Sequence, residues 1–268
     1  MNNTKEFVKS LLSIHDDYKS KMSPAPSFIR ITTITALTKI ECGIDILDME
    51  KFKETFKNGI FIKKAGSVQG FQWTLKENGF YNQATIEYTD KYSKKSIKVF
   101  PNCTIHITGC YSIDDCKIVV KQLCFIFKKI MKDQGVEPKE IKCEDCRIVM
   151  INTNFSINSV LNLSNIISVM KSKGAIVTFN PETYSAVKIK FVPGVGMKQI
   201  TASIFSSGKI IITGAVNLKE IIAAYKFILG AIYEKKADTI LRSSEDTDTF
   251  EYFMGYSLES QWRTEILK

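Results

Sequence analysis

The chain has 268 residues, 44% hydrophobic and 24% charged, a balance typical of a soluble globular protein with one large domain or two small ones that share a sheet. Lysine and arginine number 37 against 28 aspartate and glutamate residues, so the net charge of +9 favours a polyanionic partner; the alternative is a merely basic soluble protein. The sequence has no apolar run near the roughly 20 residues that cross a bilayer, no signal core at its charged N-terminus, and an odd number of seven cysteines, which indicates reduced thiols. We therefore expect an intracellular protein without a membrane partner.

The N-terminal region, residues 1–27, predicts an amphipathic helix over residues 4–19 followed by a Ser-Pro-Ala-Pro linker. Residues 28–40 then alternate between apolar and polar in the manner of a strand, residues 48–56 have helical periodicity, and residues 81–88 predict a further strand. These elements open a unit that we place at residues 28–136.

A hairpin and a long helix complete this unit. The alternation over residues 97–109 is interrupted at Pro101-Asn102-Cys103, which predicts two antiparallel strands joined by a tight turn. Ser112 precedes Asp115 by three residues, a capping signature, and the helix that follows has an apolar face opposite a lysine face and is expected to stop at Gly135. Residues 137–144 are polar and contain a proline, so we expect a linker there.

The same order of elements then recurs over residues 145–236. A strand is predicted at 147–157, a helix at 161–170, a strand at 184–191, a hairpin at 202–214 and a long helix at 218–233. Phe100 and Phe205 are 105 residues apart, and so are Gly109 and Gly214, with no gap between the two copies. The duplication predicts an α+β fold: a pseudo-twofold saddle with one continuous curved antiparallel sheet and two long helices on its convex face.

The opposite face of such a sheet is left bare and would carry Phe100 and Phe205. A bare face is normally polar, and a large exposed apolar surface usually marks a binding site. The alternative is that both phenylalanines lie in the core beneath the helices.

Residues 237–268 form an acidic and aromatic tail. It could bind a partner protein, fold back onto the basic sheet, or be simply packed or disordered.

Enzyme chemistry and metal binding have little support in the sequence. It lacks a glycine-rich nucleotide loop, a nucleophile–histidine–acid set and a spaced acidic cluster. Cys143 and Cys146 have metal-ligand spacing, but a structural zinc site needs four ligands and no second pair accompanies them. We expect no enzyme activity, no cofactor and no metal.

The segment Ile204-Phe-Ser-Ser-Gly-Lys-Ile-Ile-Ile-Thr-Gly214 resembles the strand–turn–strand of the TATA-box-binding protein (TBP) family, and the resemblance covers approximately residues 28–235. The sequence differs from the cellular members of the family and is most similar to the divergent TBP-like proteins of large nucleocytoplasmic DNA viruses. The resemblance implies a transcription initiation factor that binds and bends AT-rich double-stranded promoter DNA through the minor groove, as a monomer on DNA, and recruits initiation factors and RNA polymerase. It would act in the nucleus or in a cytoplasmic viral factory, or be packaged in the virion.

The resemblance also implies which residues contact DNA. Aromatic wedges fall on Tyr81 with Phe100 and on Tyr184 with Phe205, where the outer member is usually phenylalanine in the family. The remaining positions line the groove or contact phosphates: Thr33, Thr35, Lys98, His106, Thr108, Met150, Asn152, Lys190, Lys209, Ile211 and Thr213.

The chain departs from the family pattern in ways that leave other functions open. Thr33 and Met150 occupy the places of the paired central asparagines. Lys209 matches a lysine of the family, but the residue at the same place in the first copy is Thr104. Lys190 lies where the family has an arginine, and its counterpart in the first copy is Glu87 or Tyr88. Because the second copy has more cations at these places, we expect the second half to hold DNA more tightly. The main alternative is a TBP-fold interaction scaffold in a transcription complex with weak or non-specific DNA binding. A second alternative is an accessory domain of an enzyme. The absence of an attached catalytic domain in this sequence argues against it.

Overall fold

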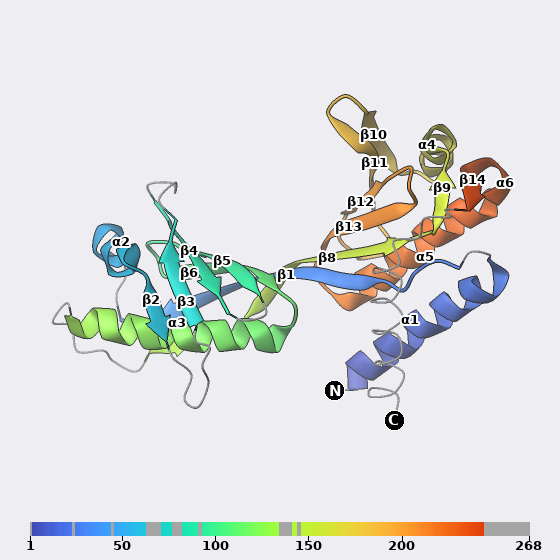
Figure 1. The fold of residues 1–268 in the computed structure, drawn as a ribbon. Helices are drawn as coiled ribbons and strands as arrows, with labels where there is room; N and C mark the ends of the chain where they lie inside the picture. Colours follow the sequence, from blue (N-terminus) through green and yellow to red (C-terminus); the bar gives the residue numbers. More distant parts are fainter. Residues whose placement is uncertain are drawn as a thin grey trace. The chain divides into compact units, whose positions relative to one another are not determined.

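The computed structural model describes residues 2–22, 25–43, 46–62, 71–76, 82–90, 93–133, 141–143 and 146–243. The chain divides into two compact units (Figure 1). One comprises Thr33–Val149 and is called the first-repeat unit; the other comprises Met1–Thr32 with Met150–Lys268 and is called the second-repeat unit. The division falls inside two strands, so the N-terminal helix belongs to the second-repeat unit and not to the repeat that follows it in sequence.

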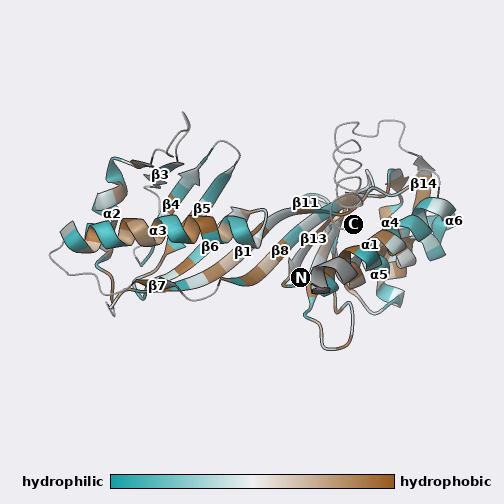
Figure 2. Cartoon of the chain, turned by 90° about the horizontal axis from the view of Figure 1, so that it is seen from below, coloured by the Kyte–Doolittle hydropathy of each residue, from teal (hydrophilic) through white to brown (hydrophobic). Residues whose placement is uncertain are grey.

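The first-repeat unit is an antiparallel sheet with helices on one face. Its strand order is β1 (Arg30–Glu41), β6 (Thr104–Cys110), β5 (Lys94–Val99), β4 (Ala84–Thr89), β3 (Phe71–Leu75) and β2 (Ile60–Ile62), and β7 (Lys142–Cys143) pairs with β1. The long helix α3 (Ile113–Asp133) lies along the sheet, with hydrophobic and hydrophilic bands on its surface (Figures 1 and 2). Phe127 of α3 and Phe52 of the short helix α2 (Met49–Lys57) are buried with their rings 5.3 Å apart, so both helices share one core.

The second-repeat unit repeats this plan. Its antiparallel sheet has the order β10 (Ile176–Asn180), β11 (Tyr184–Phe191), β12 (Ile200–Ile204), β13 (Lys209–Ala215) and β8 (Arg147–Ser156). The helices α4 (Leu163–Ser172) and α5 (Leu218–Glu234) match α2 and α3 in their order along the chain. The short helix α6 (Lys236–Thr239) leads into β14 (Ile240–Ser243), which pairs with β9 (Ser159–Leu161), so the first residues of the expected tail are ordered here; residues 244–268 lie outside the described ranges.

The N-terminal helix α1 (Asn2–Lys21) packs against α5. The rings of Tyr18 and Tyr233 stack at 5.3 Å, and His15 Nδ1 lies 3.3 Å from the hydroxyl oxygen of Tyr225. That hydroxyl donates to the carbonyl oxygen of Ser27 at 3.2 Å. The amphipathic helix predicted at 4–19 is therefore part of the core of the second-repeat unit.

The two hairpins have the same backbone design, which explains their constant offset in sequence. Cys103 and Gly208 each close the turn with a positive φ, 59° and 84°. Gly109 and Gly214 also have positive φ, 103° and 94°, and each lies where the register with the next strand shifts. A glycine of this kind makes a bulge that bends the strand.

Both long helices begin with the expected cap. The amide of Asp115 donates to Ser112 Oγ at 3.1 Å, and the amide of Glu220 donates to Asn217 Oδ1 at 3.0 Å. Each bond satisfies one of the amides that a helix start leaves without a partner. The expected stop at Gly135 and most of the expected linker lie outside the described residues.

Candidate nucleic-acid interface

Strand alternation gives each unit one sheet face covered by helices and one, called its open face, on which none of the described helices lies. In the first-repeat unit, Ile97, Ile105 and Ile107 are fully buried on the helix side. The residues between them point the other way, and cross-strand pairs such as Lys98 with His106 hold them in register. The open face of the first-repeat unit comprises Thr33, Thr35, Leu37, Lys39, Thr85, Glu87, Lys94, Ser96, Lys98, Phe100, Thr104, His106 and Thr108.

Phe100 follows β5 and lies on this open face. Its ring is half-buried and meets the ring of His106 edge-on, with the centroids 5.3 Å apart. The alternative that Phe100 lies beneath α3 is therefore wrong. Its expected wedge partner, Tyr81, lies outside the described residues.

The second-repeat unit has a corresponding open face. Ile210 and Ile212 are buried towards α5, whereas Ile211 points away and pairs with Ser203 on one side and Asn154 on the other. The open face of the second-repeat unit comprises Met150, Asn152, Asn154, Tyr184, Lys188, Lys190, Thr201, Ser203, Phe205, Lys209, Ile211 and Thr213.

An aromatic pair stands on the outer part of this face. The rings of Tyr184 and Phe205 meet edge-on with centroids 5.8 Å apart, and Lys188 Nζ lies 4.4 Å from the centroid of the Tyr184 ring. A cation at that distance is attracted to the ring face. Phe205 is fixed by the turn, where its amide donates to the carbonyl oxygen of Lys209 at 2.9 Å. The two aromatic residues predicted from the sequence are thus brought together in this repeat, and Lys188 joins them.

Strand register identifies the counterpart of Lys190, which the sequence left open. Lys190 pairs with Thr201, and Glu87 pairs with Ser96. Ser96 and Thr201 are themselves 105 residues apart, as are the other matched hairpin positions. The counterpart of Lys190 is therefore Glu87, and a positive charge in one repeat is replaced by a negative charge in the other.

Two lysines hold Glu87. Lys76 Nζ lies 3.1 Å from Glu87 Oε2, and Lys94 Nζ lies 3.7 Å from Oε1. The hydrogen bond from Lys76, together with the charges of both lysines, lowers the pKa of Glu87 below its ordinary value. The open face of the first-repeat unit therefore carries an ionised carboxylate at neutral pH.

Several residues of the open faces were missed in the sequence. Lys188, Ser203 and Ser96 lie two residues from predicted positions, and Thr201 and Thr85 lie four residues from them. A period of two would have placed them on the same face. Their neighbours were identified through the family resemblance, which gives single positions and not the whole face.

The cysteines give no metal site. Within the described part of the chain, no three His, Cys, Asp or Glu side chains are grouped to hold an ion. Cys42 and Cys103 are buried thiols with their sulfur atoms 3.6 Å apart. Cys124 is disulfide-bonded, so the expectation of reduced thiols is wrong at this position.

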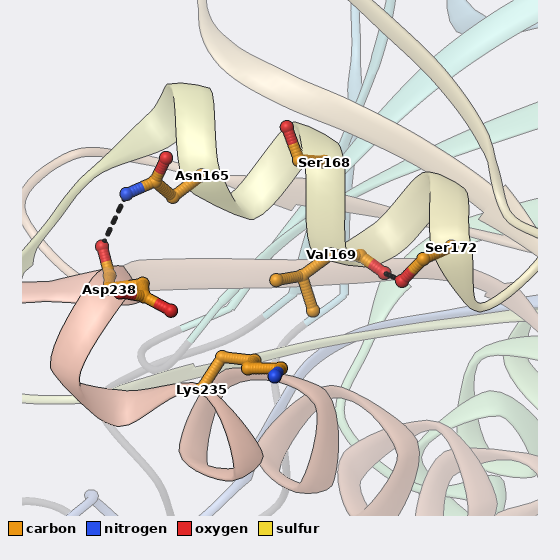
Figure 3. A pocket seen from close by; sticks show the side chains of 6 residues that line it. All are labelled: Asn165, Ser168, Val169, Ser172, Lys235 and Asp238. Atoms are coloured by element: carbon orange, nitrogen blue, oxygen red, sulfur yellow. Dashed lines mark hydrogen bonds between the residues drawn. The ribbon is translucent and has the colours of Figure 1, made fainter.

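A shallow pocket of about 380 Å³ lies among α4, α6 and the end of α5 in the second-repeat unit (Figure 3). Asn165 Nδ2 donates to the carbonyl oxygen of Asp238 at 2.8 Å at one end of it, and Lys235 lines another side. The lining has no group of side chains suited to catalysis. Among the described helices, none is long and apolar enough to cross a membrane.

Comparisons with known proteins agree with the repeated fold. The family model of transcription factor TFIID, or TATA-binding protein, matches residues 145–235. A TATA-box-binding protein-like protein of Acanthamoeba polyphaga mimivirus is 31% identical over 264 residues, covering 83% of this chain and 72% of the relative. The structure of the Methanococcus jannaschii TBP superposes with a TM-score of 0.51 at 20% identity, covering 77% of this chain and 98% of that one. The α+β fold implied by the resemblance is confirmed, and the chain belongs to the TATA-box-binding protein family.

Proposed function

We propose that this protein is a transcription initiation factor that binds AT-rich promoter DNA through the minor groove, bends it, and recruits initiation factors and RNA polymerase. The observation that carries the proposal is the aromatic pair of Tyr184 and Phe205, which stands beside a sheet face of small hydroxyl, amide and apolar side chains. No enzyme activity is part of the proposal. The protein would act where transcription takes place, in a nucleus or a viral factory.

The chemistry of the open faces suits the minor groove. At A·T pairs this groove presents almost only hydrogen-bond acceptors, which hydroxyl and amide groups can satisfy as donors. Thr108 and Thr213 supply such hydroxyls at matched positions, and Asn152 supplies an amide. Ile211 and Met150 add apolar surface without a hydrogen-bonding demand. These residues favour A·T pairs without reading a detailed sequence.

The aromatic pair provides the means to bend the duplex. A ring pressed between base pairs costs a few kcal/mol of unstacking, which additional protein contact offsets. Flexible steps such as TA lower that cost and are therefore preferred without direct contact to their base edges. The hydroxyl of Tyr184 needs a polar partner if it is buried, so Phe205 is the member that would enter the step and Tyr184 would stack beside it.

Recruitment is assigned to surfaces away from the open faces. α3 exposes the lysines Lys117, Lys121 and Lys128 together with Phe125, which is 65% exposed. An exposed aromatic residue among cations suits a protein partner better than it suits bulk solvent.

Binding should be measured on a TATA-containing duplex and on a GC-rich duplex of equal length across a salt series. Fluorescence transfer between dyes at the two DNA ends reports bending. We expect tighter binding to the TATA duplex and a shorter end-to-end distance. Equal, salt-driven binding to both duplexes without shortening would contradict the proposal.

The variant Phe205→Ala tests the wedge. Loss of base–aromatic stacking should weaken binding on the order of tenfold and reduce the bend. Lys128→Ala removes an exposed charge from α3 and serves as the control, with a small effect on both measurements. Equal effects of the two variants would show that the open face is not the DNA-binding face.

The second candidate function is a TBP-fold scaffold that assembles proteins and binds DNA weakly. The observation in its favour is the charged pair of positions Glu87 and Lys98 on the open face of the first-repeat unit. In the same experiments a scaffold would bind both duplexes alike and leave their length unchanged.

A further inference from the structure

The open faces of the two units differ most in charge. Matched by strand register, Lys188, Lys190 and Lys209 of the second-repeat unit correspond to Thr85, Glu87 and Thr104 of the first-repeat unit. Three changes run the other way, since Lys39, Lys94 and Lys98 of the first-repeat unit correspond to Ser156, Gln199 and Ser203. The backbone design is therefore duplicated, but the distribution of cations is not.

Glu87 also affects the lysines around it. Its two carboxylate oxygens engage Lys76 and Lys94, at 3.1 and 3.7 Å. A lysine that is paired with a carboxylate is a weaker ligand for a phosphate, because the pair must first be separated. Glu87 thus adds a negative charge to this face and neutralises two cations beside it.

Lys188 and Lys190 are in the opposite situation. Both are exposed on β11, on the same face as the aromatic pair, and neither ammonium has an ion-pair partner within the described ranges. Lys188 is held over the Tyr184 ring, which leaves its charge intact. These lysines can meet phosphates that flank the step entered by Phe205.

We infer that Glu87 makes the grip on the DNA backbone one-sided, because it pairs with Lys76 and Lys94 of the first-repeat unit, whereas its counterpart Lys190 adds a cation to the second-repeat unit. This inference rests on the proposed function and assigns to Glu87 the difference in phosphate binding between the repeats. Each phosphate neutralised by a lysine releases counterions and steepens the salt dependence of binding, whereas a carboxylate at the same place opposes it. Charge, and not the duplicated fold, then decides which half holds the duplex.

The test compares charge changes at matched and unmatched positions in the full chain, with binding to the TATA duplex measured from low to high salt. Glu87→Lys should raise affinity at low salt by tenfold or more and steepen the plot of log affinity against log salt by about one unit. Glu87→Gln, which frees Lys76 and Lys94, should act in the same direction by a smaller amount. Glu54→Lys makes the same change of charge on α2, on the helix side of the unit, and should leave the slope unchanged.

The reciprocal variant is Lys190→Gln, which should lower affinity and make the slope shallower by about one unit. Lys226→Gln removes an exposed charge from α5 and is its control. All five substitutions are at exposed or half-exposed positions, so the fold should persist, as thermal unfolding can verify.

The inference is overturned if Glu87→Lys behaves as Glu54→Lys does, or if Lys190→Gln behaves as Lys226→Gln does. Failure of the proposed function has a different signature: the unchanged protein would neither prefer the TATA duplex nor shorten it. Glu87→Lys could still steepen the salt dependence in that case, which would leave the one-sided grip in place on DNA of any sequence.

Discussion

Each repeat has an acidic residue near the start of its long helix, and the two carboxylates have different hydrogen-bond and ion-pair partners. Asp115 and Glu220 are 105 residues apart, and each accepts a backbone amide four residues before it, from Tyr111 at 3.2 Å and from Val216 at 2.8 Å. Glu220 is one methylene longer and also accepts the amide of Lys198 at 3.2 Å. Backbone amides alone therefore hold the acid in the second repeat.

The shorter Asp115 has a side-chain partner in its place. Lys95 Nζ lies 3.1 Å from Asp115 Oδ1 and 3.6 Å from Asp90 Oδ2, and only 1% of the Lys95 side chain is exposed. The matched residue in the second repeat is the buried Ile200. The comparison indicates that the longer side chain of Glu220 is held by two backbone amides, whereas the shorter side chain of Asp115 pairs with a buried lysine. A buried cation can occupy a core position when carboxylates accompany it.

The outer faces of the long helices differ as well. Gly230 of α5 lies beneath α1, where an added Cβ would be 3.5 Å from the Tyr18 hydroxyl oxygen. The matched residue of α3 is Phe125, which is exposed. A small residue lets the N-terminal helix approach α5, whereas the matched position of α3 carries a large, exposed one. The repeats therefore share their sheets and diverge on the surfaces that meet other segments.

The largest expected effect is at Lys95. Lys95→Ala removes the buried cation from beside the half-buried carboxylates of Asp90 and Asp115, and we expect it to lower the free energy of unfolding of the first-repeat unit by about 3 kcal/mol. Urea unfolding with hydrogen exchange resolved by unit would measure this loss. The double variant Lys95→Ile with Asp115→Asn, which places the isoleucine of the second repeat at position 95 and removes the charge of Asp115, should recover most of the stability. A loss below about 1 kcal/mol in the single variant would contradict the role of the ion pair.

The hairpin turns offer a second contrast. Gly208 has φ of 84°, and an added Cβ would overlap the carbonyl oxygen of Ser159. Gly208→Ala should therefore cost about 3 kcal/mol from strain and overpacking together. Cys103, its counterpart, already holds a side chain at φ of 59°, with its thiol against that of Cys42.

The counterpart variant, Cys103→Gly, should change stability by no more than about 1 kcal/mol, because relief of the strained backbone offsets the lost thiol contact. Thermal unfolding of both variants gives the comparison. If Cys103→Gly were the more damaging of the two, the thiol contact and not the turn geometry would control this hairpin.

Elements with strong local patterns could be predicted from the sequence. The strand expected at 184–191 is β11 with the same bounds, and the helix expected at 218–233 is α5 with one more residue. Alternation, capping residues and the glycines of the turns are all local, and the duplication made each pattern visible twice. Alternation alone left the faces of Phe100 and Phe205 undecided, and the matching register of the two copies favoured the open faces.

Contacts between distant segments could not be predicted in this way. The pairing of β9 with β14 joins residues 159–161 to residues 240–243, and strands of three or four residues have too little periodicity to be recognised. The packing of α1 against α5 depends on His15, Tyr18 and Gly230. Helical periodicity does not distinguish these contact residues from others on the same helices. Lys95 was missed because a charged residue argues against burial until its two carboxylates are brought to it in space.

The smallest predicted effect is a difference between the two bulge glycines. Gly109→Ala and Gly214→Ala both place a side chain at a positive φ, so both should lose about 1–3 kcal/mol through backbone strain. An added Cβ at Gly109 would lie 2.9 Å from the carbonyl oxygen of Lys94 and 3.3 Å from the Cα of Lys95, whereas at Gly214 the nearest atom is 3.7 Å away. Overpacking against backbone should make Gly109→Ala the worse variant by about 1 kcal/mol. Parallel urea titrations of the two proteins would measure this gap. Equal losses would mean that strain alone sets the cost and that β5 yields to the added methyl group, and a larger loss at Gly214 would be inconsistent with the closer approach of the strands in the first repeat.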